Sequence, residues 1–375
     1  MASLYRTVRP LLFRAGPERA HGAGIALGRI GQRLPGLVRA LHRAPADPDG
    51  RLRVRAFGLD FENPIGVAAG LDKNAELVPL WTQIGCGFSE VGSVTARPSD
   101  GNPRPRAFRL PLDEALVNRM GLNNQGAARV AERIAALGPK RTRPLAINVA
   151  KTHDPAILGD AALDDFAEST QALLPLADVL VLNVSCPNTA EGKTFEDPGA
   201  LDALLERVMA VREGLGLGTP VLVKLSPPPA ADFDPGPVDE LIDLSRSRGV
   251  AGFVATNTAS DRAGLERTPD REVDAIGRGG LSGAPLRARA LALLAHLYRR
   301  VGDDLPLIGV GGIDSPAAVY ERIRAGASLV ELYTGLVYAG PGLVARSLRA
   351  LRRALERDGL GTVQQAVGAD ADRHR

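Results

Sequence analysis

Short apolar runs alternate with amphipathic stretches from residue 65 onward, and this alternation predicts eight strand–helix units. The expected strands cover residues 65–69, 88–94, 145–149, 179–183, 221–225, 252–256, 307–310 and 329–333. A helix is expected after each strand, near residues 73–84, 124–137, 161–175, 198–214, 236–248, 285–300, 316–325 and 341–356.

The predicted strands are apolar on both faces, which is typical of a parallel sheet covered by helices. Eight such units in roughly 300 residues favour a closed (β/α)8 TIM barrel. A doubly wound open sheet is the alternative. The predicted fold class is therefore α/β, a TIM barrel with an N-terminal two-helix extension.

Residues 1–44 carry a different pattern. Leu4, Val8, Leu11 and Leu12 fall at helical spacing, and a second apolar stripe runs over residues 25–41 beyond a break near Pro17. The segment holds eight arginines and one acid, whereas the whole chain has a net charge of +3. Basic amphipathic helices bind membrane surfaces. A helical cap packed on the main domain is the alternative.

Composition sets the remaining limits. A hydrophobic fraction of 45% is ordinary for a soluble protein, and two cysteines, Cys86 and Cys186, indicate a reducing, cytoplasmic setting. No apolar run approaches the roughly 18 residues of a spanning helix, and no signal peptide is expected. We expect an extension at residues 1–44, a barrel at 45–357 and a poorly ordered polar tail at 358–375.

Polar or glycine residues follow all eight predicted strands, where the active site of a TIM barrel lies. The fourth strand leads into Asn183-Val184-Ser185-Cys186-Pro187-Asn188-Thr189. Carboxamides bind planar polar ligands, and a thiol beside them can act as a base or nucleophile. We therefore expect one active site on this rim.

Glycines after the seventh and eighth strands predict a phosphate site, since bare backbone can approach an anion there. Lys224 ends an apolar strand and would suit an anionic cofactor ring, while Lys73 could pair with a substrate carboxylate. Neither a metal-ligand pattern nor a dinucleotide-binding glycine motif is present. These features predict a phosphorylated cofactor such as FMN.

Residues 64–340 resemble the dihydroorotate dehydrogenase family, the flavin enzymes of pyrimidine biosynthesis. The resemblance runs through residues 69–73, 92–95, 101–106, 118–124, 183–189, 224–227, 256–258, 279–283, 309–313 and 332–334. It implies oxidation of dihydroorotate to orotate, with FMN accepting hydride.

The resemblance also implies the site residues. FMN would meet Ala69, Gly70, Ser93, Asn148, Asn183, Lys224 and Thr256 along its ring and ribityl chain, and Gly283, Gly312, Tyr333 and Thr334 at its phosphate. The substrate would meet Lys73, Asn118, Arg119, Met120, Gly121, Leu122, Asn183, Asn188, Asn257 and Thr258. Lys224 would stabilise the reduced flavin.

Cys186 is the implied catalytic base, with Ser185 the alternative. Quinone-using members of the family usually carry serine where this chain has Cys186, and cysteine is typical of the soluble class. Residues 190–194 also depart from the usual pattern.

The family divides by oxidant, and quinone-using members carry an N-terminal helical extension that sits on the membrane. Residues 1–44 resemble that extension, and Pro17-Glu18-Arg19-Ala20-His21 resembles its usual sequence. His21, Arg104 and Arg106 are then candidate residues of a quinone tunnel. A peripheral enzyme on the cytoplasmic face of the cell membrane is implied, with a membrane quinone as acceptor and neither nucleic acid nor metal as partner.

Two alternatives stay open at this point. One is a soluble-type dihydroorotate dehydrogenase that uses fumarate. The other is a related FMN barrel that acts on pyrimidines or on uridine in RNA.

Overall fold

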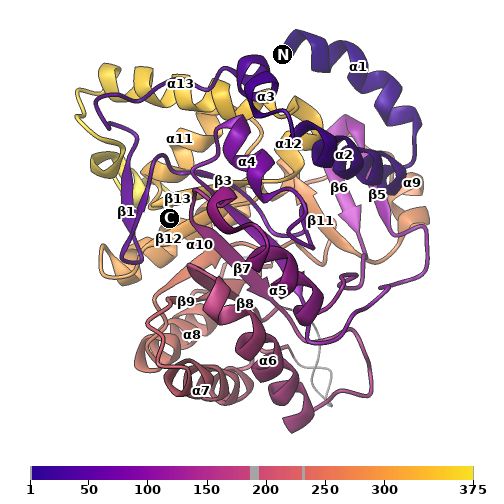
Figure 1. Ribbon diagram of the computed structural model, residues 1–375, viewed down its shortest axis with the longest axis vertical. Helices are drawn as coiled ribbons and strands as arrows, with labels where there is room; N and C mark the ends of the chain where they lie inside the picture. The colour runs from indigo at the N-terminus through magenta and orange to yellow at the C-terminus, as the bar shows by residue number, and fades with distance from the viewer. Residues whose placement is uncertain (1, 186–193, 230–232, 375) are drawn as a thin grey trace.

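A closed parallel barrel forms the centre of the molecule (Figure 1). The computed structural model describes residues 2–185, 194–229 and 233–374. The barrel strands follow each other in chain order: β3 (Ile65–Val67), β4 (Phe88–Val94), β7 (Leu145–Val149), β8 (Val179–Asn183), β9 (Val221–Leu225), β10 (Gly252–Ala255), β12 (Leu307–Val310) and β13 (Leu329–Leu332). Pairing of β13 with β3 closes the sheet, so the predicted barrel is confirmed and the open sheet is excluded.

A helix follows each barrel strand, as the sequence predicted. These helices are α4 (Val78–Ile84), α5 (Ala127–Ala135), α6 (Asp160–Leu173), α7 (Pro198–Gly214), α8 (Gly236–Ser247), α10 (Arg287–Val301), α11 (Pro316–Arg324) and α13 (Gly342–Arg357). Local chemistry fixes the start of α11. Ser315 accepts a hydrogen bond from the Ala318 N–H at the start of α11, and Pro316 occupies its first turn.

Smaller elements decorate the barrel. An antiparallel sheet joins β5 (Ala107–Leu110), β6 (Ala115–Asn118) and β11 (Gly280–Gly283), and β1 (Val54–Ala56) pairs with β2 (Leu59–Phe61). The remaining helices are α9 (Asp270–Ile276) and α12 (Thr334–Ala339), with 3-10 turns η1 (Pro111–Asp113), η2 (Gly138–Lys140), η3 (Leu174–Leu176), η4 (Ala284–Leu286), η5 (Val363–Ala366) and η6 (Ala371–Arg373).

The N-terminal extension forms three helices in its described residues, α1 (Ala2–Arg14), α2 (Pro17–Gly31) and α3 (Pro35–His42). Our prediction of two helices is wrong because Pro35 interrupts the second apolar stripe and starts a new helix. The helices pack on the barrel. Tyr5 Oη donates to the Val337 carbonyl at 2.5 Å, and Gln32 Nε2 donates to the Glu76 carbonyl at 3.0 Å.

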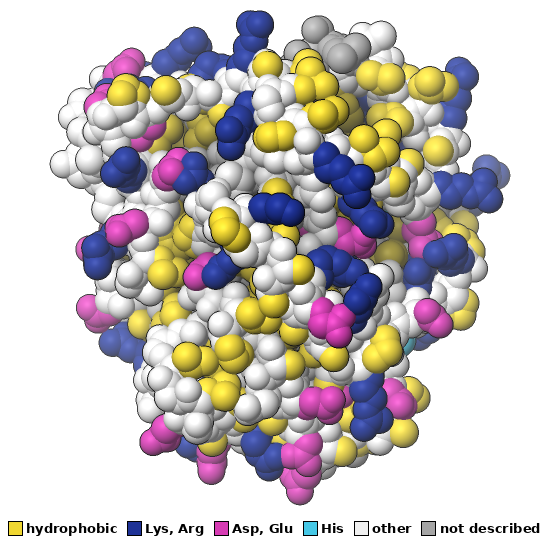
Figure 2. All heavy atoms as spheres, in the orientation of Figure 1, with side chains coloured by type: hydrophobic (Ala, Val, Ile, Leu, Met, Phe, Trp, Pro, Cys, Tyr) yellow, Lys and Arg dark blue, Asp and Glu magenta, His cyan; other side chains and the backbone are white. Residues whose placement is uncertain are grey.

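The same helices leave a row of apolar side chains in solvent. The exposed members are Val8, Leu11, Leu12, Leu27, Ile30, Leu34, Leu37 and Leu41. Figure 2 shows apolar side chains and arginines together over this end of the molecule. None of the helices in the described ranges is long and apolar enough to cross a bilayer.

The loop after β3 is organised by one buried carboxyl group, that of Asp72. It accepts hydrogen bonds from the backbone N–H groups of Glu76 at 2.7 Å and Leu77 at 2.8 Å, and from Trp81 Nε1 at 3.3 Å. Burial raises the pKa of Asp72 to about 6 despite these donors. This loop delays the start of the helix expected at residue 73 until Val78.

The C-terminal segment is packed on the barrel rather than poorly ordered, so that part of our prediction is wrong. Val363 is 1% exposed and its N–H donates to the Arg51 carbonyl at 2.8 Å. Farther along, the Asp370 carboxylate pairs with Arg324. The few apolar residues of the segment are spaced too irregularly to predict this packing.

Replacing Val363 by aspartate should lower the free energy of unfolding by about 3 kcal/mol, because a charge would enter an apolar contact. Gln364→Asp is the matched control, since Gln364 is exposed, and it should change the free energy by less than about 0.5 kcal/mol. Chemical denaturation followed by circular dichroism measures both. Equal small effects would show that the segment does not pack as described.

Asp72 should impose a specific pH dependence on stability. Its pKa is raised on folding, so the folded state holds this proton more tightly, and the stability it contributes is lost as pH rises through about 6. From about pH 4 to about pH 8, wild type should therefore lose about 2 kcal/mol more than Asp72→Asn. The exposed Asp274→Asn is the control. If the free energy of unfolding changed with pH by the same amount in wild type and Asp72→Asn, the burial of the Asp72 carboxyl group would be contradicted.

Candidate active site

A buried cluster of charged side chains lies inside the barrel, below the C-terminal ends of its strands. Lys224 of β9 places Nζ 2.9 Å from Glu90 Oε2 on β4 and 3.7 Å from Glu331 Oε2 on β13. Asn148 Nδ2 of β7 donates to Glu90 Oε1 at 2.7 Å, and the Ala69 N–H donates to Glu90 Oε2 at 3.2 Å. The predicted residues Lys224, Asn148 and Ala69 thus meet at one point.

Lys224 is held as a cation. Burial alone would lower the pKa of Lys224, but the carboxyl groups of Glu90 and Glu331 outweigh burial and raise it above its ordinary value. The sequence analysis missed both glutamates. A usable signal existed, because each is the single charged residue of a buried strand.

A second network of amides and hydroxyls joins the ends of β4, β8 and β10. Asn183 Nδ2 donates to Ser93 Oγ at 3.0 Å, and Ser185 Oγ donates to Asn183 Oδ1 at 2.9 Å. Asn257 Nδ2 reaches both Asn183 Oδ1, at 3.1 Å, and Ser185 Oγ. The structure thus brings these four predicted residues together. Cys186 and Asn188 lie outside the described residues.

Two neighbours extend this network. Thr256 Oγ1 donates to the Asn257 carbonyl at 2.5 Å, and the Thr258 N–H donates to Asn257 Oδ1 at 2.8 Å. The first bond holds the backbone of Asn257 and the second orients its carboxamide, so the rim presents donors and acceptors in a defined orientation. A planar ligand with amide edges is the kind of molecule that such a surface binds.

Backbone surrounds a small cavity next to β12 and β13. Its lining residues are Glu114, Gly283, Ala284, Gly312, Ile313, Asp314, Thr334, Gly335 and Tyr338. Glycine is needed here: a Cβ on Gly312 would lie 2.6 Å from Arg287 Cα, and one on Gly335 would lie 2.1 Å from the Ile313 carbonyl oxygen. Three predicted phosphate residues, Gly283, Gly312 and Thr334, therefore share one cavity. The fourth, Tyr333, packs its ring against Gly70 instead.

A buried cation that the sequence did not predict lies next to this cavity. Arg322 of α11 is 1% exposed, and its Nη2 donates to the carbonyls of Gly311 at 2.6 Å and Arg287 at 2.9 Å. Its Nε and Nη1 atoms have no hydrogen-bond partner in the described part of the chain, and burial lowers the pKa of Arg322 to about 9. A buried guanidinium whose hydrogen bonds in the described residues all go to carbonyls favours a nearby anion.

The predicted substrate residues on the 118–124 segment divide into two groups. Lys73 Nζ donates to Asn123 Oδ1 at 2.8 Å, and Asn118 Nδ2 donates to the Gly280 carbonyl at 3.4 Å. Arg119 instead engages α9 and its end, through the carbonyls of Ile276 and Arg278. The arginine side chain therefore fastens the loop, so contact with substrate from Arg119 stays a prediction.

The backbone of the same segment shapes its turn. The Asn102 N–H donates to the Met120 carbonyl at 3.1 Å, and Gly121 and Leu122 adopt φ values of 70° and 50°. A Cβ on Gly121 would lie 2.5 Å from the Asn102 nitrogen, so only glycine fits there.

Helix α2 brings the N-terminal extension to this side of the barrel. Glu18 accepts a hydrogen bond from Arg106 Nε at 2.9 Å and pairs with Arg104 Nε at 3.3 Å. Arg106 is buried, whereas Arg104 is largely exposed. Burial lowers the pKa of His21, and the positive charge of Lys73 lowers it further, which places His21 near the predicted substrate lysine. The sequence analysis missed Glu18 as the partner of both arginines.

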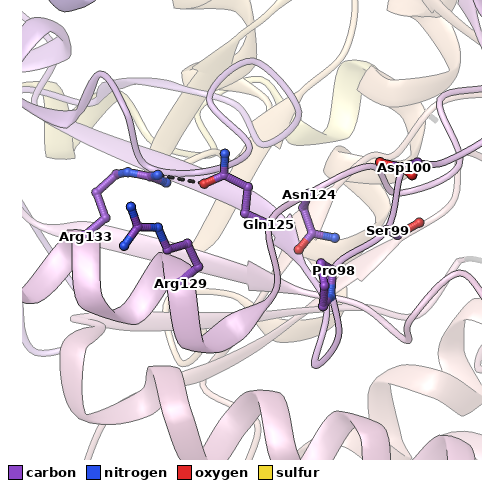
Figure 3. Close-up of a pocket in the computed structure, with 7 residues that line it drawn as sticks. All are labelled: Pro98, Ser99, Asp100, Asn124, Gln125, Arg129 and Arg133. Atoms are coloured by element: carbon purple, nitrogen blue, oxygen red, sulfur yellow. Dashed lines mark hydrogen bonds between the residues drawn. The ribbon is translucent and has the colours of Figure 1, made fainter.

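A separate cavity of about 510 Å³ opens outside the rim (Figure 3). It is lined by Pro98, Ser99, Asp100, Asn124, Gln125, Arg129 and Arg133. Its arginines already have partners: Arg129 pairs with Glu132 at 2.7 Å, and Arg133 donates to Gln125 Oε1 at 2.7 Å. No predicted cofactor or substrate residue lines it, so we do not assign the chemistry there.

The donor set fits a flavin mononucleotide. The buried Oδ1 of Asn148 has no hydrogen-bond partner among the described residues and could accept from a ring N–H. The bare backbone of Gly312 and Gly335 at the glycine-lined cavity suits the approach of a phosphate, and Arg322 donates to the carbonyl of the adjacent Gly311. In the described ranges, no group of three His, Cys, Asp or Glu side chains could hold a metal ion.

Comparisons with known proteins show which family this chain belongs to. The family model described as dihydroorotate dehydrogenase matches residues 51–355. A protein of Nocardia farcinica named dihydroorotate dehydrogenase (quinone) is 44% identical, covering 98% of this chain and 97% of its own. A protein of the same name from Deinococcus deserti is 43% identical over 98% of this chain and 99% of its own.

A solved structure extends the likeness to the fold. The crystal structure of an Eimeria tenella DHODH in complex with ferulenol has a TM-score of 0.83 and 31% identity, covering 97% of this chain and 98% of that one. The shared barrel, the matching family model and the nearly full-length relatives lead to one conclusion: this chain belongs to the dihydroorotate dehydrogenase family.

Proposed function

We propose that this protein oxidises dihydroorotate to orotate, with bound FMN as hydride acceptor and a membrane quinone as electron acceptor, in the synthesis of UMP. The arrangement of α2 carries this proposal, because Glu18 of this helix binds Arg106 and Arg104, which belong to the 101–106 segment of the barrel. An N-terminal extension thus meets the substrate side of the barrel. The relatives named dihydroorotate dehydrogenase (quinone) cover the chain over the same length, extension included.

The cofactor would lie across the strand ends. Asn148, Lys224 and the backbone near Ala69 and Gly70 would hold its ring, while Ser93, Asn183 and Thr256 lie at the neighbouring strand ends. Its phosphate would enter the cavity of Gly283, Gly312 and Thr334. When bound, FMN supplies the two-electron acceptor that links substrate to quinone.

The substrate would stack on the amide network. Dihydroorotate has a ring of alternating N–H and C=O groups, which match the carboxamides of Asn118, Asn183 and Asn257. Asn188 would add a fourth carboxamide. Lys73 would bind the substrate carboxylate, and residues 120–122 and Thr258 would complete the pocket. Fixing the ring in one orientation supplies much of the catalytic advantage.

The reaction needs a base on the side of the substrate that faces away from the proposed flavin. A base takes the proton from C5 while the hydrogen on C6 leaves as hydride, and the C5=C6 double bond forms. Cys186 is the proposed base, since a free thiol has a pKa of about 8.5, far nearer neutrality than a serine hydroxyl. Ser185, whose hydroxyl donates to Asn183, is the alternative.

The extension would bind the membrane surface and admit the quinone. Its exposed leucines lie among Arg29, Arg33 and Arg39, a pattern that suits an anionic lipid surface. His21, Arg104 and Arg106 would lie along the quinone path. Peripheral attachment at the cytoplasmic face is the localisation that we propose.

The function is tested by anaerobic mixing. Purified protein with dihydroorotate should lose its flavin absorbance, and a short-chain quinone, but not fumarate, should restore it quickly. Recovery with fumarate alone would place the enzyme in the soluble class and contradict the quinone. A flavin that dihydroorotate does not bleach would remove this substrate and favour a related barrel that acts on other pyrimidines.

The base is tested by Cys186→Ala, with Ser185→Ala as the matched variant. The cysteine variant should keep bound FMN but reduce it at least about 100-fold more slowly with dihydroorotate, in stopped-flow absorbance. In wild type, reduction should remain appreciable near neutral pH, and Cys186→Ser should shift the pH profile upward. Unchanged reduction in Cys186→Ala together with a large loss in Ser185→Ala would assign the base to Ser185.

A further inference from the structure

The cluster under the proposed flavin ring contains more acid than base. Glu90 and Glu331 are 0% and 1% exposed, and Lys224 is 6% exposed. Glu90 reaches the cluster from β4, Glu331 from β13 and Lys224 from β9. If both carboxyl groups were ionised, one buried negative charge would lack a partner, which costs several kcal/mol in a protein interior.

The donors around the cluster distinguish the two carboxyl groups. Glu90 accepts hydrogen bonds from Lys224 Nζ, Asn148 Nδ2 and the Ala69 N–H. Neither Oε atom of Glu331 accepts a hydrogen bond from any donor in the described ranges. Three donors stabilise an anion, whereas a carboxyl group without donors is the one that keeps its proton.

Both carboxyl groups face the same ammonium: Lys224 Nζ lies 2.9 Å from Glu90 Oε2 and 3.7 Å from Glu331 Oε2. Two carboxylates that share one buried cation repel each other, so the free energy is lower when one of them keeps its proton. The charged groups that face Glu331 are Glu90 of β4 and Lys224 of β9. The cluster is electrically neutral when Glu331 alone is protonated.

We propose that Glu331 is a neutral carboxylic acid that donates a hydrogen bond to ionised Glu90, and that this pair positions the Lys224 ammonium beneath the flavin ring. Burial, and then the charge of Glu90, raises the pKa of Glu331 well above its ordinary range. Burial would also raise the pKa of Glu90, but the charge of Lys224 and the hydrogen bonds lower it on balance. Glu331 acts through Lys224 and is a positioning residue.

The functional consequence rests on the proposed FMN site. When the cluster is neutral, no excess negative charge of the glutamates opposes the attraction between Lys224 and the reduced, anionic flavin ring. If Glu331 lost its proton at high pH, a net negative charge would form below the ring, and the reduction potential of the flavin would fall. Glu331→Gln keeps the shape and the neutral state, so its flavin potential should lack this fall.

Infrared spectroscopy tests the protonation directly. At about pH 8, where Asp72 with its pKa of about 6 is ionised, wild type should show a protonated-carboxyl C=O band that shifts in D2O. Glu331→Gln should lose that band. Glu196→Gln is the control, because Glu196 is a half-buried glutamate that accepts a hydrogen bond from the Ser226 N–H, and this variant should keep the band.

Glu90→Gln provides a second test without altering Glu331. Removing the ionised partner leaves Lys224 opposite Glu331 alone, so Glu331 should ionise and the acid band should disappear here too. Persistence of the band in Glu90→Gln would overturn the proposal. So would its absence from wild type.

These measurements need neither dihydroorotate nor quinone. A protein that binds FMN and shows the band, but does not oxidise dihydroorotate, would refute the proposed function and leave the proton assignment standing.

Discussion

The register between β13 and β3 is the constraint on which the active site depends. Val330, Glu331 and Leu332 pair with Ile65, Gly66 and Val67, and this pairing turns an open sheet into a closed barrel. Because all barrel strands are parallel, closure gathers their C-terminal ends on one rim. Closure also brings Glu331 within 3.7 Å of Lys224, although more than a hundred residues of chain separate them.

The barrel could be predicted from the sequence because its strands are apolar on both faces. The predicted strand at 145–149 coincides with β7, and the one at 221–225 coincides with β9. Lys224 and Asn183 could be placed on the rim for the same reason, since each ends a run of buried residues. The local sequence pattern is therefore sufficient to predict a strand whose residues are all buried.

Other features depend on partners distant in the chain, and local pattern does not show these. Strand β11 pairs with β6 across more than 160 residues, and four-residue strands give a periodic pattern too short to recognise. Glu90 and Glu331 are each a single acid in a buried strand, and the sequence does not show what pairs with them. Their partner, Lys224, comes close only in the folded barrel. The tail residue Val363 is buried in the core, and its N–H donates to the carbonyl of Arg51, which lies more than 300 residues earlier in the chain.

The extension and the cofactor cavity are joined through one short helix. Tyr5 and Arg9 of α1 donate to the carbonyls of Val337 and Tyr338 in α12, and α12 begins at Thr334, which lines the glycine cavity. Two binding events that order one element are thermodynamically coupled, and the coupling is reciprocal. If the extension binds a lipid surface as proposed, order imposed on α1 there should strengthen binding of the proposed cofactor, and loss of that cofactor should weaken binding to the lipid surface.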